Sequence, residues 1–119
     1  MNLHRWDDIA FKELIPGIVG RLIDSDRTMF CRFHYEPGVN EPIHRHESKQ
    51  FSYVIKGGVC FLSEEAEIEA GPGDVVHIPS KVLHGALVLG EKAEVIEIIS
   101  PIRPDLNPAA GEGQKTTKG

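Results

Sequence analysis

The residues best suited to chemistry are two histidines separated by one position, His44 and His46, followed by Gln50. On a β-strand, positions i and i+2 point to the same face, so the two imidazoles would project side by side. A short turn would bring the next strand alongside, where Gln50 can offer an amide oxygen to the same centre. His84, which follows the segment 79–83, is the best candidate for a fourth ligand. The spacing therefore predicts one divalent metal ion held by these four side chains.

The composition is that of one globular domain. The 119 residues are 40% hydrophobic and 26% charged, with a formal net charge of −5. No apolar run approaches the roughly 18 residues of a membrane span, and residues 1–6 lack the apolar region of a secretory signal, so we expect a cytoplasmic protein. The negative charge argues against nucleic acid or an anionic membrane as a partner, because both need clustered positive charge. A small anionic substrate stays open, since one arginine can bind it.

From Gly17 onward the hydrophobic pattern has a period of two, which predicts strands. Candidate strands cover 18–23, 28–35, 43–46, 49–55, 58–63, 66–70, 74–78, 82–89 and 93–100, with turns at Gly57-Gly58 and Gly90-Glu91-Lys92 among others. Short strands without intervening helices indicate a β-sandwich or barrel. We expect residues 1–16 to be an extension with a helical turn or irregular structure, 17–106 to be the barrel, and 107–119 to be a disordered tail without apolar periodicity. Cys31 and Cys60 are expected as reduced, core-packed thiols.

Two spaced half-motifs resemble those of the cupins. The first is Gly38-x5-His44-x-His46-x3-Gln50-x6-Gly57, in which cupins usually have Glu where this chain has Gln50, and the second is Gly73-Asp74-x4-Pro79-x4-His84, which ends in Val88 rather than Asn. The resemblance covers about residues 28 to 100. It implies an all-β, single-domain double-stranded β-helix (jelly-roll) barrel with a divalent metal inside, and commonly a homodimer.

The glutamine at position 50 has a consequence for the metal. Three neutral imidazoles and a neutral amide leave the full +2 charge on the ion, which suits a Lewis acid that grips an anionic or carbonyl oxygen. The set departs from the triad of two histidines and one carboxylate found in non-haem iron oxygenases. Nitrogen and oxygen donors of this kind suit Zn, Ni, Fe, Mn or Co, so the sequence does not select the metal.

A second informative stretch begins at Glu97 and ends in Ser100-Pro101-Ile102-Arg103. This ending is similar to that of the KdgF-type cupins of pectin and uronate degradation, which convert the ring form of 4,5-unsaturated uronates to linear 5-keto-4-deoxyuronate. The resemblance implies that Glu97 and Arg103 are catalytic residues. The chain departs from the family pattern in having Glu rather than Asp at position 97, and Ile99 where an aromatic is usual.

Alternation along 93–100 places Val95, Glu97 and Ile99 on one face, and both faces are largely apolar, which predicts a strand covered on both sides. Burial would raise the pKa of the Glu97 carboxyl and suit it to proton transfer near neutral pH. The structural alternatives are a solvated Glu97 paired with Lys92, and an Arg103 that ties down the chain end. His34 and His77 are interpreted as packing residues.

The favoured function is a metal-dependent enzyme that tautomerises and opens an unsaturated uronate. Two other classes stay open, a metal-dependent oxygenase acting on a diketone or phenolic compound, and a non-catalytic cupin that binds a sugar or other small ligand. Anaerobic assays would separate the first of these from the uronate enzyme, because an oxygenase needs dioxygen.

Overall fold

The protein's structure, a computed structural model, describes residues 1–106. A 3-10 helix, η1 (Trp6–Asp8), precedes eight strands that form one antiparallel sheet. The strands are β1 (Lys12–Ile15), β2 (Ile18–Asp24), β3 (Met29–Tyr35), β4 (Asn40–His44), β5 (Lys49–Leu62), β6 (Glu67–Ala70), β7 (Val75–Ile78) and β8 (His84–Ser100). The predicted all-β class is confirmed, and the tail predicted at 107–119 lies outside the described residues.

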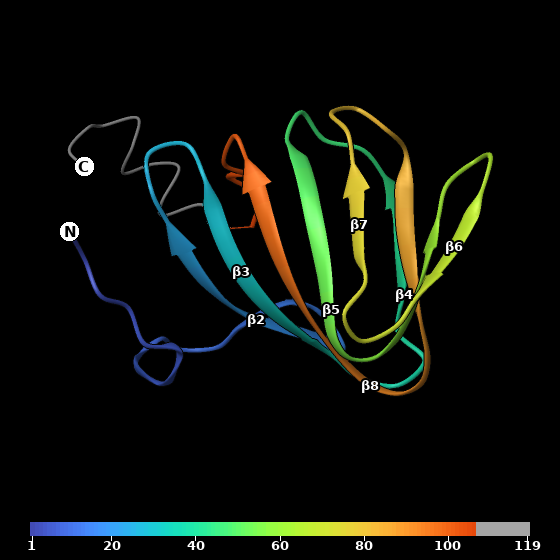
Figure 1. The fold of residues 1–119 in the computed structure, drawn as a ribbon, viewed down its shortest axis with the longest axis horizontal. Coiled ribbons are helices and arrows are strands. Elements are labelled where there is room, and N and C mark those ends of the chain that lie inside the picture. Colours follow the sequence, from blue (N-terminus) through green and yellow to red (C-terminus); the bar gives the residue numbers. More distant parts are fainter. Residues whose placement is uncertain (107–119) are drawn as a thin grey trace.

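Two long strands, β5 and β8, connect both halves of the fold (Figure 1). The sheet order is β1-β2-β3-β8-β5-β6, with β4 paired to β8 and β7 paired to β5. The second half of β8 pairs with β3, and its first half pairs with β4, while β5 pairs along both halves. Strand β8 therefore carries Glu97 in its second half and pairs with the strand that carries His44 along its first half.

The length of these strands corrects the prediction of turns at Gly57-Gly58 and Gly90-Glu91-Lys92. Gly57 and Gly90 have φ of 79° and 70°, in the left-handed region that glycine adopts without steric cost. The ladder between β5 and β8 shifts register on both sides of Lys56. The glycines thus bend continuous strands from one half of the barrel to the other instead of ending them.

Residues 1–16 also contain a strand that was not predicted. Lys12–Ile15 pairs antiparallel with β2 and extends the sheet beyond the predicted first strand. A four-residue segment is too short for an alternating hydrophobic pattern to be recognised in the sequence. Which of its sides is covered depends on the strand it pairs with, and the local sequence does not contain that information. The one helical turn expected in this segment is present as η1.

The core lies between the two halves of the barrel. Its largest fully buried apolar side chains come from β2, β3, β5 and β8, and include Ile18, Met29, Val54, Val95 and Ile99. Both cysteines are buried and unpaired, as expected. The described part of the chain has no helix of the length and apolar character needed to cross a membrane.

Candidate metal centre and adjoining cavity

Three of the predicted ligands come together. His44 ends β4, His46 follows it in the turn, and His84 begins β8 as the direct cross-strand partner of His44. One ring nitrogen from each lies within 4.8 Å of the others, and the ring centroids are 4.5 to 5.4 Å apart. Gly85 allows this approach, because a Cβ there would lie 2.7 Å from the Glu41 carbonyl oxygen on β4.

Backbone carbonyls fix the orientation of each ring. The Nδ1–H groups of His44, His46 and His84 donate to the carbonyls of Pro42, Ser48 and Val82 at 2.9, 2.7 and 2.8 Å. A carbonyl can only accept, so Nδ1 carries the proton and Nε2 keeps its lone pair. Such second contacts are typical of metal-binding histidines.

The predicted fourth ligand, Gln50, is buried at the start of β5. Its Nε2 donates to the Ser52 hydroxyl at 3.0 Å, which assigns Oε1 as the remaining acceptor. This Oε1 and the Nε2 of His46 are both buried without a hydrogen-bond partner within the described residues. Orphaned buried acceptors are costly unless a cation or donor satisfies them, so three imidazoles and this amide fit a divalent ion.

Burial also keeps two of the histidines neutral. It lowers the pKa of His46, and it lowers the pKa of His84 to about 4, with the neighbouring imidazoles adding to the effect. Neutral imidazole is the form that binds a metal, so these ligands are ready for it at neutral pH.

Glu97 is buried at 6% exposure in the second half of β8. The Ser52 hydroxyl donates to its Oε2 at 3.0 Å, so a short chain of hydrogen bonds joins Gln50, Ser52 and Glu97. Burial, with a smaller contribution from nearby Glu41, raises the pKa of the Glu97 carboxyl to about 7. The alternative of a solvated Glu97 paired with Lys92 is wrong, because Glu97 is buried and makes no ion pair within the described residues, while Lys92 lies beside Glu36.

The prediction that strand 93–100 is covered on both faces is wrong in part. Val95, Glu97 and Ile99 are buried as expected, but Ile98 on the opposite face is 42% exposed. The sequence shows that both faces are apolar, whereas only the arrangement of strands decides which face is enclosed.

Arg103 lies after β8 with its side chain 12% exposed. Its Nε and Nη2 donate to the two carboxylate oxygens of Asp105 at 3.2 and 2.6 Å, and its backbone N–H donates to the Met29 sulfur at 3.3 Å. The guanidinium therefore already holds one carboxylate in a two-pronged contact, the geometry that arginine offers to carboxylates in general.

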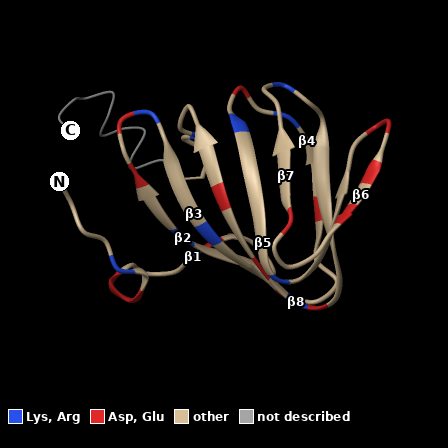
Figure 2. Cartoon of the chain, in the orientation of Figure 1, with Lys and Arg blue, Asp and Glu red and all other residues tan. Residues whose placement is uncertain are grey.

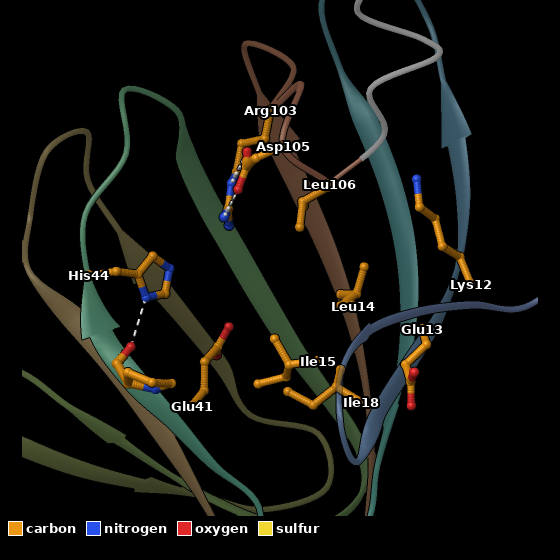
Figure 3. Close-up of a pocket in the computed structure, with 11 residues that line it drawn as sticks. Lys12, Glu13, Leu14, Ile15, Ile18, Glu41, His44, Arg103, Asp105 and Leu106 are labelled. Atoms are coloured by element: carbon orange, nitrogen blue, oxygen red, sulfur yellow. Dashed lines mark hydrogen bonds and ion pairs between the residues drawn. The ribbon is translucent and has the colours of Figure 1, made fainter.

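A cavity of about 390 Å³ extends from His44 of the histidine cluster to Arg103 (Figure 3). Leu14, Ile15 and Ile18 form an apolar wall, and His44, Arg103 and Glu41 contribute the polar side. The contribution of β1 to this wall and the carboxyl of Glu41 were both missed by sequence reasoning. Strict alternation along β4 would put the side chains of Glu41 and His44 on opposite faces of the sheet. The pairing of β4 with β8 shifts register between these two residues, and both side chains line the cavity.

Comparisons with known proteins agree with this architecture. The family model described as "Cupin domain" matches residues 31–99. The KdgF structure from Halomonas sp. is 28% identical, with a TM-score of 0.77 over 83% of this chain and 94% of that chain. An RmlC-like cupin from Shewanella frigidimarina is 21% identical, with a TM-score of 0.81 over 88% and 95% of the two chains.

A third solved structure, the polyketide cyclase RemF from Streptomyces resistomycificus, is 24% identical, with a TM-score of 0.76 over 87% of this chain and 82% of that chain. At the identities of the RmlC-like cupin and RemF, the likeness concerns the fold alone. No curated protein sequence matches this chain. The family model covers more than half of the residues and includes all four predicted ligands, so this chain belongs to the cupin family.

Proposed function

We propose that this cupin is a metal-dependent enzyme that converts cyclic 4,5-unsaturated uronates to linear 5-keto-4-deoxyuronate. The observation that carries the proposal is the buried Glu97, which is linked through Ser52 to Gln50 beside the histidine cluster. The similarity to KdgF from Halomonas sp. supports the same substrate class.

The reaction transfers one proton overall within the substrate. The anomeric O–H bond breaks, its electrons form the aldehyde, and the bond from the anomeric carbon to the ring oxygen breaks. The resulting enolate becomes a ketone as the alkene carbon takes up a proton. A divalent ion in the site would supply Lewis-acid stabilisation of negative oxygen. His44, His46, Gln50 and His84 would hold it.

The buried Glu97 and the side chains that line the cavity fit the remaining tasks. Glu97, with its pKa raised to about 7, can hold a proton at neutral pH and deliver it. Arg103 can bind the uronate carboxylate, sharing or exchanging the contact that it makes with Asp105. The apolar wall of Leu14, Ile15 and Ile18 limits access of water to the opened intermediate.

The test is turnover of unsaturated uronates by the metal-loaded protein. We expect loss of the ultraviolet absorbance of the conjugated alkene faster than in an enzyme-free control, and deuterium at the former alkene carbon in D₂O. Glu97→Gln should lower kcat by about 10²-fold with metal content intact. Activity that requires dioxygen would indicate an oxygenase instead. Uronate binding without turnover would indicate a non-catalytic binding protein.

A further inference from the structure

The carboxyl of Glu41 lines the same cavity as His44 of the histidine cluster and Arg103. It extends from β4 into the cavity, with His44 on one side and Ile15 and Ile18 on the other (Figure 3). Within residues 1–106, no hydrogen bond or ion pair holds this carboxyl. A half-buried carboxyl that is unpaired at a cavity wall is available to a ligand.

The groups facing Glu41 come from three other elements besides its own strand. His44 on β4 and Arg103 after β8 favour its charged form, while burial, as the largest effect, raises its pKa. Glu97 on β8 and Tyr35 on β3 are close enough to interact with it electrostatically. Lys12, Glu13 and Asp105 line other parts of the same cavity.

The proposed reaction needs two proton-transferring groups at different atoms. One group must accept the anomeric hydroxyl proton, and another must donate a proton to the alkene carbon. Glu97 is not among the residues lining the 390 Å³ cavity and is only 6% exposed, so it meets a ligand over a small edge at most. Glu41 lines that cavity directly, beside the metal-binding histidine His44.

We propose that Glu41 is the general base of the reaction and that Glu97 is the acid, an assignment that rests on the function proposed above. The anomeric O–H bond breaks and its proton goes to the Glu41 carboxylate. The electron pair of that bond forms the aldehyde carbonyl, and the pair of the breaking ring C–O bond leaves on the ring oxygen. The enolate then forms the ketone as the alkene carbon takes the Glu97 proton. Glu41 gains one proton and Glu97 loses one, and proton exchange between the two carboxyls or with solvent restores the starting state.

The experiment compares wild type, Glu41→Gln and Glu69→Gln. Glu69 is an exposed residue of β6 and undergoes the same chemical change away from the cavity. Each variant is measured for metal content, melting temperature, binding of saturated galacturonate by calorimetry, and turnover of the unsaturated uronate. We expect Glu41→Gln to keep its metal and its affinity for the saturated sugar acid, and to lose about 10²-fold or more in kcat. Glu69→Gln should match wild type in all four.

The outcomes separate this inference from the proposed function. Wild-type turnover matched by Glu41→Gln would overturn the assignment of Glu41 and leave the proposed function standing. Loss of metal or of saturated-uronate binding in Glu41→Gln would make Glu41 part of the binding site and would also overturn its role as a base. A wild-type protein that turns over no unsaturated uronate would overturn both.

Discussion

At the scale of single residues, Glu97 is the group whose environment most changes its chemistry. Its carboxyl lies between β3 and β5, opposite Cys31 and Ser52, with one hydroxyl donor. One hydrogen bond does not compensate for the loss of water around a charge, so the neutral acid is favoured. The site therefore holds a proton that an exposed glutamate would have released.

This environment predicts an effect of Glu97→Gln on stability that depends on pH. The pKa of Glu97 is raised from 4.5 to about 7 on folding. The stability that its neutral form contributes is fully present below the unfolded pKa and is lost as pH rises through about 7. Gln is neutral at every pH. As pH rises from 5 to 8.5, the free energy of unfolding of the metal-free variant should therefore increase by about 1–3 kcal/mol relative to that of wild type. Urea unfolding at both pH values measures this, and a difference between the two proteins that does not change with pH would show that Glu97 ionises freely.

Arg103 and Asp105 make a second residue-scale prediction. Arg103→Ala should weaken binding of anionic substrates and leave neutral sugars unaffected, because it removes the guanidinium donors. Asp105→Asn removes the carboxylate that the Arg103 guanidinium now binds and that competes with the substrate carboxylate. We therefore expect a lower KM for the uronate with kcat unchanged. Steady-state kinetics with charged and neutral sugars measures both. If Arg103→Ala weakened both classes equally, its role would be to tie down the chain end.

How far the site follows from the sequence differs from residue to residue. The three histidines were predictable because their spacing depends only on strand geometry and a family motif, and the burial of Glu97 followed from alternation. Glu41 was not predictable, because a register shift puts it on the cavity side against the alternation. The Arg103–Asp105 contact depends on the path of a non-repetitive segment, which local sequence does not determine.

At the scale of elements, the sequence located the strands but not their continuity. Period-two segments were visible at 49–55 and 58–63, yet they are one strand, because the intervening glycine bends the chain without reversing it. β1 was missed although its Leu14 and Ile15 form part of the apolar wall of the cavity. In both cases the deciding information is the partner strand, which lies far away in the sequence.

The close approach of β4 and β8 at Gly85 predicts that a larger residue there lowers metal affinity. A Cβ at Gly85 would come within 2.7 Å of the Glu41 carbonyl oxygen and 3.1 Å of the Ile43 backbone nitrogen. Gly85→Ala should therefore displace β4 with His44 and lower metal affinity by at least about tenfold, as expected when ligand geometry is lost. Gly71→Ala is the matched control, because a Cβ there meets nothing within 4 Å. Equal metal affinity in the two variants, measured by competition with a chelator, would mean that β4 tolerates the shift.

At the scale of the whole molecule, one outer face of the sheet is left apolar. Phe30, Phe51, Tyr53, Val75 and Ile98 are 38 to 57% exposed, and they are cross-strand neighbours over β3, β8, β5 and β7. Figure 2 shows long stretches of these strands without charged residues, although single charged positions lie within β3, β8 and β6. Contiguous exposed apolar surface is typical of interaction sites, and a second copy of this chain is the occupant we propose.

Homodimer formation through this face can be tested with one charge. Ile98→Glu places a carboxylate in the middle of the apolar residues and should convert the dimer to a monomer in analytical ultracentrifugation. Ile68→Glu is the control, because Ile68 is exposed to a similar degree, 50% against 42%, but lies on β6 outside the face. A wild-type monomer, or an Ile98→Glu dimer, would contradict the proposal.

The central claim is that the side chains brought together from β4, β5 and β8 hold one divalent ion. Elemental analysis of purified wild type and of the His44→Ala/His46→Ala double variant tests it most directly. We expect one metal ion per wild-type chain and none in the variant, which keeps its fold because the core does not depend on the site. A folded double variant that retains one ion per chain would contradict it.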